Sequence, residues 1–287
     1  MKNQNRKNQT IKSSTKNHGF HHSQKNDRHN SQPTISDNSL LVFGKHPIFT
    51  ILEKRRRKVF EIFVTRNTEQ ELQEFLKKNS LTHPPSLIKV VDNNQIENLV
   101  GRDQAHQGFA MRVAKLPIKN QNDLLEELYA FGEGEKLPTL VMLDQISDPH
   151  NVGAIIRSAI SFGAKKIIFC EHSAPKENAT IIKASSGTIE SADLFVVTNF
   201  NNLIEKLKKI DYWCIGLDGN SQHKISEIRD YKNVALIIGS EGNGIRDLVK
   251  KNCDFLAKIE IDKEVESLNA SVAASIALYE LSQRKNV

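Results

Sequence analysis

The carboxy-terminal half of the chain repeats one pattern: a short apolar segment, a polar turn, and a segment of helical periodicity. The apolar segments predict strands at residues 139–144, 166–169, 194–197, 212–217, 234–238 and 255–260. Helices are predicted between them, near residues 151–162, 178–186, 200–209, 245–251 and 269–284. Strands of continuous apolar character that alternate with helices are typical of a parallel sheet covered on both faces. The pattern therefore predicts an α/β fold.

Residues 39–116 predict a separate, small α/β domain. Pro47 fits the first turn of a helix, and further elements are predicted at residues 59–64, 69–78, 88–91, 94–99 and 108–113. A polar linker and an amphipathic helix with Leu124, Leu125 and Leu128 follow in residues 117–135. The second domain then spans residues 136–287, and a chain of 287 residues has room for two domains of ordinary size.

Residues 1–38 are rich in Asn, Lys, Ser, Gln and His and are predicted to be disordered. They hold seven Lys or Arg against two Asp, a balance of +5, which leaves +1 of the net charge of +6 for the rest. Such a basic tail can attract RNA without specificity, or it can be a compositional feature with no function. The basic run KRRRK at residues 54–58 likewise has two interpretations, a phosphate-contacting patch or a solvated helix end.

Several classes of protein are disfavoured by the sequence. No apolar run approaches the roughly 18 to 20 residues of a membrane span, and the first residues lack the apolar core of a secretory signal. We therefore expect a cytoplasmic protein without a membrane partner. Cys170, Cys214 and Cys253 lie about forty residues apart, a spacing that suits neither a disulfide framework nor a zinc site, and we expect no metal.

In parallel sheets, ligands bind beyond the carboxyl ends of the strands, and three loops there carry unusual residues. The first, DPHNVGAIIRSA, follows Asp144 and places Asn151 near the start of a predicted helix and Arg157 within it. An arginine among apolar helix residues needs a partner. A surface ion pair and a site residue are equally good interpretations of Arg157.

The second loop, IIGSEGNGI at residues 237–245, sets Glu241 between glycines. Glycines allow close approach of the backbone to a ligand, but the dinucleotide fingerprint and the phosphate-loop lysine are both missing. The carboxylate argues against a bound phosphate and favours a cationic ligand, or a role in which Glu241 fixes an arginine.

The third segment, SLNASVAASIALYE at residues 267–280, opens a helix with the capping residues Ser267 and Asn269. Its alanines allow another helix to approach closely. This helix can form an interface between molecules or pack within its own domain.

Taken in order and at their separations, these three segments resemble the three motifs of the SpoU/TrmH family of RNA ribose 2′-O-methyltransferases. The resemblance covers residues 40–285. The stretches LVFGKHPIFTIL and HQGFAMRV are similar to the small RNA-binding domain of its RlmB-like branch, which methylates a guanosine of 23S rRNA in the large ribosomal subunit.

The resemblance implies an enzyme that uses S-adenosylmethionine, has a carboxy-terminal domain tied into a trefoil knot, and works as a homodimer on RNA. It implies that backbone groups hold the cofactor at Gly216, Leu217, Gly239, Ile259 and Leu268. It implies that the catalytic surface consists of Asn151, Arg157, Glu241, Ser267 and Asn269. Glu260 and Lys263 stand where the family often has Pro and Gly, which leaves the path of that loop open.

We hypothesise that Arg157 binds a phosphate beside the target nucleotide and stabilises negative charge on the 2′ oxygen, while Glu241 and Asn151 hold its guanidinium. Arginine is a poor base, so the proton leaves to water or to His150. Alternative functions are tRNA ribose methylation and RNA binding without catalysis. A nicotinamide-dependent oxidoreductase is disfavoured because its glycine fingerprint is absent.

Overall fold

The computed structural model describes residues 38–82, 85–132 and 134–283. Residues 37–287 form one compact unit. The predicted disordered tail, residues 1–38, lies outside the described residues apart from Asn38. Within the described ranges, no helix is long and apolar enough to cross a membrane.

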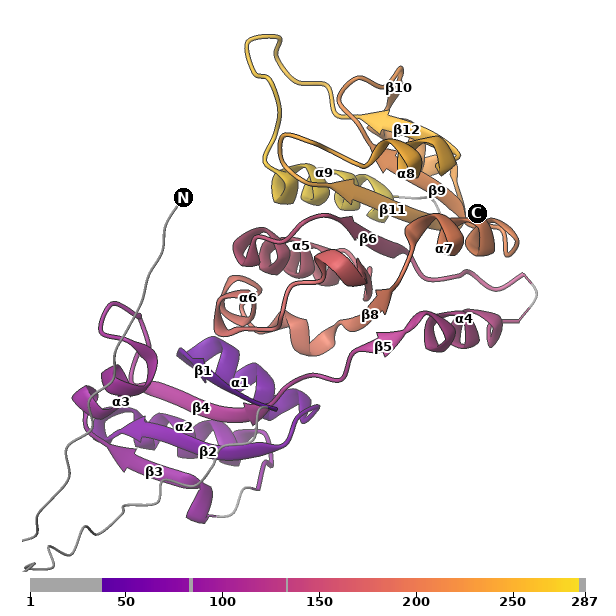
Figure 1. The fold of residues 1–287 in the computed structure, drawn as a ribbon. Coiled ribbons are helices and arrows are strands. Elements are labelled where there is room, and N and C mark those ends of the chain that lie inside the picture. Colours follow the sequence, from indigo (N-terminus) through magenta and orange to yellow (C-terminus); the bar gives the residue numbers. More distant parts are fainter. Residues whose placement is uncertain (1–37, 83–84, 133, 284–287) are drawn as a thin grey trace, which may run out of the picture. The chain divides into compact units, whose positions relative to one another are not determined.

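A four-stranded sheet with three α-helices forms the amino-terminal part (Figure 1). The strand order is β1-β4-β2-β3, with β4 antiparallel to both neighbours and β2 parallel to β3. The elements are β1 (Ser39–Phe43), α1 (Lys45–Lys54), β2 (Val59–Thr65), α2 (Arg66–Lys78), the 3-10 turn η1 (Pro85–Leu87), β3 (Ile88–Val91), α3 (Asn93–Val100) and β4 (Phe109–Ala114). Strand β1 is an addition to the predicted elements.

The carboxy-terminal part is built on an eight-stranded sheet in which every neighbouring pair is parallel. Its order is β10-β12-β9-β11-β6-β7-β8-β5. The strands are β5 (Lys119–Asn120), β6 (Leu140–Asp144), β7 (Lys166–Cys170), β8 (Asp193–Val197), β9 (Trp213–Leu217), β10 (His223–Lys224), β11 (Val234–Gly239) and β12 (Phe255–Lys258). All six predicted strands are confirmed, and the two short edge strands are additional.

Helices cover both faces of this sheet (Figure 1). The α-helices are α4 (Gln121–Tyr129), α5 (Pro149–Ser161), α6 (Ala179–Ala184), α7 (Phe200–Lys208), α8 (Asp247–Asn252) and α9 (Ala270–Ser282). The 3-10 turns are η2 (Glu171–Ser173), η3 (Thr188–Ser191) and η4 (Ile225–Asp230). The order of elements agrees with an α/β fold, whereas the trefoil knot stays a prediction because strand order alone does not define threading.

Strand β6 shows why the apolar runs are continuous. Val141 and Leu143 belong to the core beneath α5 and α9, whereas Leu140 and Met142 belong to the core beneath α4 and α7. Because successive side chains of a strand point to opposite faces, both sets must be apolar. The parallel sheet therefore leaves polar chemistry to the loops beyond the strand ends.

Helix α5 begins two residues before its predicted start, because Asp148 caps it. The Asp148 carboxylate accepts hydrogen bonds from the backbone N of His150 and of Asn151, and Pro149 occupies the first turn. Both features stabilise a helix start. Asn151 consequently lies in the first turn of α5, at the carboxyl edge of the sheet.

Candidate active site

A cavity of about 580 Å³ lies beyond the carboxyl ends of β9, β11 and β12. Its volume is within the usual range of ligand sites. Four of the predicted cofactor-binding residues line it: Leu217, Gly239, Ile259 and Leu268. Gly216 lies one residue before the lining, where a Cβ would come within 2.7 Å of Leu256 and 2.9 Å of Ile245. Gly216 thus packs closely against these two side chains beneath the site.

The glycine loop after β11 folds back onto the end of its own strand. Ser240 N donates to Gly244 O at 3.2 Å, and Gly244 N donates to Ser240 O at 2.9 Å. A Cβ on Gly239 would lie 2.0 Å from the carbonyl carbon of Gly244 and 2.2 Å from Ile245 N. The loop can take this path only with glycine at residue 239.

The ionisable groups that line the cavity are mainly acidic. They are Asp218, Glu241, Asp262 and Glu266 against Lys250 and Lys263. Burial alone raises the pKa of the Asp218 carboxyl, but the hydrogen bond and the charge of Lys250, 2.6 Å away, lower it overall. The excess of carboxylates favours a ligand with a positive centre over a phosphate.

The sequence did not point to the Asp218–Lys250 pair. Asp218 follows directly after a strand, which is a usable signal for a site residue. Lys250 sits inside a helix without any special pattern.

One carboxylate oxygen, Glu241 Oε1, joins all three predicted motifs. Asn151 Nδ2 donates to it at 2.9 Å, Asn269 Nδ2 donates to it, and the backbone N of Ala270 lies 3.3 Å away. Asn269 Nδ2 also donates to Asn151 Oδ1 at 2.9 Å. Glu241 in the loop after β11, Asn151 in α5 and Asn269 at the cap of α9 are therefore held in one network, and Glu241 and Ser267 also line the cavity.

Asn269 also caps α9. Its Oδ1 accepts hydrogen bonds from Ser271 N at 2.9 Å and Val272 N at 3.2 Å. The side chain therefore uses its acceptor for the helix start and its donors for Glu241 and Asn151. An asparagine suits both tasks because it carries an acceptor and two donors.

Arg157 lies apart from this network. Six residues of α-helix separate it from Asn151, about 9 Å along the axis and about 240° around it. Its side chain is exposed and makes no hydrogen bond or ion pair within the described ranges. The predicted contact of Glu241 and Asn151 with Arg157 is therefore not present in this chain: these residues hold each other and Asn269 instead.

A second arginine, Arg246, fixes the glycine loop to the sheet. Its Nε and Nη2 lie 2.8 and 2.7 Å from Oδ1 of the fully buried Asp144, and its backbone N donates to Oδ2 at 2.9 Å. The hydrogen bond that the Arg246 guanidinium donates to Asp144, together with the carboxylate charge, raises the pKa of the guanidinium. Asp144 and Arg246 were not predicted as a pair.

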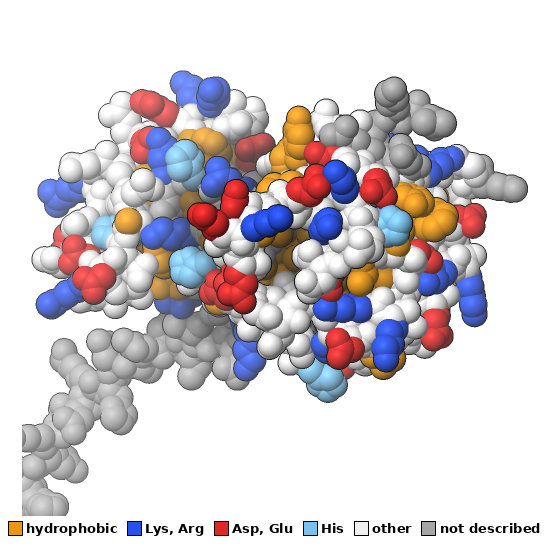
Figure 2. All heavy atoms as spheres, turned by 90° about the horizontal axis from the view of Figure 1, so that it is seen from above, with side chains coloured by type: hydrophobic (Ala, Val, Ile, Leu, Met, Phe, Trp, Pro, Cys, Tyr) orange, Lys and Arg blue, Asp and Glu red, His pale blue; other side chains and the backbone are white. Residues whose placement is uncertain are grey.

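The face drawn in Figure 2 carries no large patch of one charge sign. On the face drawn in Figure 2, Lys and Arg side chains are interspersed with Asp and Glu. Within the part of the chain that the structure describes, no group of three or more His, Cys, Asp or Glu side chains could hold a metal ion.

Two family models match the chain. Residues 138–279 match the SpoU rRNA methylase family, and residues 41–118 match the substrate-binding domain of RNA 2′-O ribose methyltransferases. The chain is 34% identical over 249 residues to a putative TrmH family tRNA/rRNA methyltransferase, YacO, of Bacillus subtilis, covering 85% of this chain and 96% of the relative. It is 29% identical to the Escherichia coli 23S rRNA (guanosine-2′-O-)-methyltransferase RlmB, covering 86% of this chain and 100% of the relative.

Solved structures agree on the fold. The SpoU methyltransferase AviRb of Streptomyces viridochromogenes, in complex with AdoMet, superimposes with a TM-score of 0.69 at 21% identity over 86% of this chain and 90% of that chain. An AdoMet-bound rRNA methyltransferase of Sinorhizobium meliloti gives 0.67 at 19% identity, covering 87% and 88%.

The parallel α/β sheet with a cavity at its carboxyl edge matches a methylase family model, and the amino-terminal part matches a substrate-binding domain, so the chain is an RNA-modifying methyltransferase. The chain belongs to the SpoU (TrmH) family of RNA methyltransferases.

Proposed function

We propose that the chain methylates the ribose 2′-hydroxyl of a guanosine in 23S rRNA, in the cytoplasm. As a SpoU family member, it is an RNA 2′-O-methyltransferase that uses S-adenosylmethionine. The choice of 23S rRNA and guanosine is supported by full-length relatives that carry this activity in their names, among them RlmB of Coxiella burnetii at 32% identity. The observation that carries the proposal is the presence of both family regions on one chain.

The cavity residues fit the cofactor. S-adenosylmethionine supplies an electrophilic methyl group on a positively charged sulfur. The acidic lining suits that charge, and the folded glycine loop brings backbone groups of residues 239–244 to the cavity wall. We propose that Leu217, Gly239, Ile259 and Leu268 hold the cofactor through backbone groups, with Gly216 packed behind them.

A second group of residues aligns the acceptor. Displacement at carbon requires the two reacting atoms in line at about 3 to 3.5 Å, so rigid positioning contributes much of the rate. We propose that the network of Asn151, Glu241 and Asn269, together with Ser267, fixes the ribose beside the cavity. Arg157 binds a phosphate and stabilises the developing charge on the 2′ oxygen, and the proton leaves to water or His150.

We propose the same division of labour that the sequence predicts. Residues 39–116 bind RNA, residues 117–135 connect, and residues 136–287 carry out methyl transfer. Two alternatives remain as outcomes of the test below. The B. subtilis relative is named as a putative tRNA/rRNA methyltransferase, and this name supports tRNA as the alternative substrate. An RNA-binding protein without catalysis is disfavoured, because Asn151, Glu241 and Asn269, one residue from each motif, are all present and hydrogen-bonded to one another.

The decisive experiment compares ribose methylation across total RNA from cells with and without this protein. One guanosine of 23S rRNA is expected to lose its 2′-O-methyl group and to regain it when the gene is restored. Loss at a tRNA position would favour the first alternative. If no ribose changes and the purified chain fails to bind S-adenosylmethionine, the non-catalytic alternative is correct.

We also propose that the enzyme is a homodimer that forms through α5 and α9. Val272 and Tyr279, one heptad apart on α9, are 46% and 49% exposed, and the Tyr279 ring packs edge-on against Phe162 beside α5. The same region carries Arg157, which finds no partner among the described residues of its own chain. A second copy is the occupant that covers this apolar surface and brings Arg157 near a site.

Gel filtration with light scattering tests the dimer. The wild-type mass is expected to be twice the 32.4 kDa of the chain, and Tyr279→Asp is expected to yield monomers with at least tenfold lower activity. Tyr129→Asp, at a 60% exposed aromatic residue on α4, is the matched control and should remain dimeric. An active wild-type monomer would overturn the dimer proposal.

A further inference from the structure

The segment from α6 to η3 packs closely against the amino-terminal part. A Cβ on Gly187 would lie 2.9 Å from the Thr50 side chain of α1 and 3.1 Å from the backbone of Pro47. The ammonium of Lys183 lies 5.1 Å from the ring centroid of Phe43 in β1. One hydrophobic cluster runs from residues of the first sheet to residues of α5 and α6.

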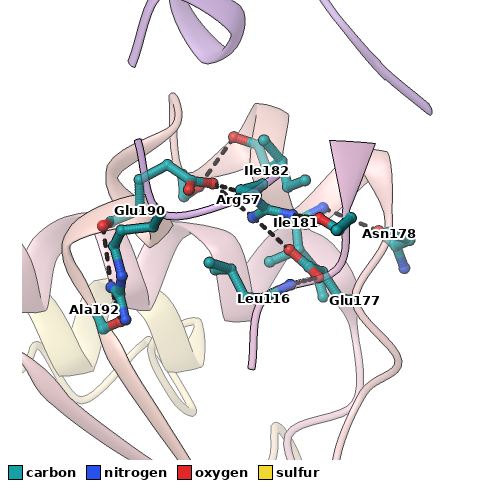
Figure 3. A network of polar contacts seen from close by, with 11 residues as sticks. Arg57, Leu116, Glu177, Asn178, Ile181, Ile182, Glu190 and Ala192 are labelled. Atoms are coloured by element: carbon teal, nitrogen blue, oxygen red, sulfur yellow. Dashed lines mark hydrogen bonds and ion pairs between the residues drawn. The ribbon is translucent and has the colours of Figure 1, made fainter. Parts of the chain in front are cut away.

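A buried ion network lies in the middle of this contact (Figure 3). Arg57 Nη2 lies 2.6 Å from both Glu177 Oε1 and Glu190 Oε1, and Arg57 Nε donates to Glu190 Oε1 at 2.8 Å. The side chains of Arg57 and Glu190 are 0% exposed and that of Glu177 is 6% exposed. Arg57, just before β2, is thus joined to Glu177, just before α6, and to Glu190 in η3.

The end of β4 and the start of the connecting chain are tied to the same network. Arg57 Nη1 donates to Ala114 O at 3.2 Å at the end of β4, and Leu116 N donates to Glu177 Oε2 at 2.9 Å. The neighbouring Arg56 donates to the backbone oxygens of Glu190 at 3.0 Å and Ala192 at 2.6 Å. Arg56 and Arg57 are therefore engaged within the chain, which corrects the phosphate-patch interpretation for these two residues of the basic run.

The environment of the Glu190 carboxylate disfavours its charged form. Its Oε2 is buried and has no hydrogen-bond partner among the residues that the structure describes, and burial raises the pKa of this carboxyl more than Arg57 lowers it. Glu177 and Glu190 share the one guanidinium of Arg57. The stability of the fold does not require this arrangement, because a buried ion pair often stabilises a protein less than apolar packing does. A role in fixing one geometry explains why charges occupy this position.

Helix α6 packs directly against helix α5, which carries residues of the candidate active site. A Cβ on Gly153 of α5 would lie 2.5 Å from the Ala184 Cβ and 2.7 Å from Ile181 O of α6. Such contact transmits displacement because packed interiors yield little. The same helix α5 carries Asn151 in its first turn and Arg157 farther along.

We propose that Arg57, held by Glu177 and Glu190, is a positioning residue that fixes the substrate-binding domain on the methyltransferase domain and so sets the RNA in register with the transferred methyl group. This inference rests on the proposed function. These three residues, which we call the clamp, act through α6 on α5. Loss of the clamp therefore changes where bound RNA is presented and leaves the cofactor cavity intact.

The test compares Arg57→Met, the paired variant Arg57→Met/Glu190→Gln and the matched control Lys54→Ala in the full chain. Arg57→Met keeps an apolar stem of similar length, and the paired variant also removes the charge of Glu190, the more deeply buried of the two carboxylates that the first change leaves without the guanidinium. Lys54→Ala removes an exposed charge from the same basic run. Each is assayed for single-turnover methylation at saturating RNA, for RNA affinity over a range of salt, and for S-adenosylmethionine affinity.

Loss of the clamp is expected to lower the rate at saturating RNA by tenfold or more, with cofactor affinity within twofold of wild type and an unchanged salt dependence of RNA binding. Cleavage by trypsin after Lys115 or Lys119, followed by mass spectrometry, is expected to accelerate at least tenfold in both Arg57 variants and not in Lys54→Ala. Lower RNA affinity with a shallower salt dependence would identify Arg57 as a phosphate contact and overturn the inference.

Unchanged cleavage and rate in the Arg57 variants would also overturn it, as would loss of folding or of cofactor binding in both of them. Failure of the proposed function is a separate result. In that case the wild-type chain itself does not methylate 23S rRNA, while the protease measurement still decides whether Arg57 holds the two domains together.

Discussion

Gly239→Ala is expected to weaken S-adenosylmethionine binding by at least 100-fold. The added Cβ would meet backbone atoms of Gly244 and Ile245 at 2.0 to 2.3 Å, and backbone cannot rotate away as a flexible side chain can. The loop would have to leave the strand end and release the hydrogen bonds between Ser240 and Gly244. A 100-fold loss corresponds to about 2.7 kcal/mol.

Isothermal titration with S-adenosylmethionine measures this effect, and thermal unfolding shows whether the fold survives. Gly132→Ala is the matched control, because a Cβ there meets only the Glu135 side chain, at 3.4 Å. A dissociation constant for Gly239→Ala within threefold of wild type would show that the loop does not hold the cofactor.

Arg157→Ala is expected to lower the single-turnover rate at saturating RNA by about 100 to 1,000-fold, the usual cost of removing one group that stabilises developing negative charge. Cofactor affinity should stay within twofold, because Arg157 does not line the cavity. Lys165→Ala, which removes an exposed charge just beyond the same helix, should keep the wild-type rate.

The proposed role of Arg157 is wrong if Arg157→Ala retains the wild-type rate.

The same assay run across pH with His150→Ala tests the proton acceptor. An unchanged rate and pH profile would leave water as the acceptor.

The central strands could be predicted because each is apolar on both faces. Residues 139–144 and 234–238 lie in the middle of the sheet, where helices cover both sides, and the structure places β6 and β11 there as neighbours. The edge strands β5 and β10 have two residues each, too few to form a pattern. Strand β1 was missed because its five residues run almost directly into a helix.

The site was predictable where the residues belong to the three motifs, and these motifs do meet at Glu241 Oε1. Ion pairs between distant segments left no local signal. Asp144 and Arg246 are 102 residues apart, and Arg57 and Glu190 are 133 residues apart. The sequence does not indicate which residue pairs with a charged residue at the end of a strand or in a basic run, because only the fold brings the two partners together.

The bonds to Glu241 have a consequence for synthesis of the protein. Asn151 and Asn269 are 118 residues apart, and the second of them opens the last helix described. A growing polypeptide on the ribosome therefore lacks this network until the helix that Asn269 caps has emerged and docked. With the role proposed for this network, methyl transfer is expected to begin only after that helix has docked, so an incompletely folded molecule is expected to leave RNA unmodified.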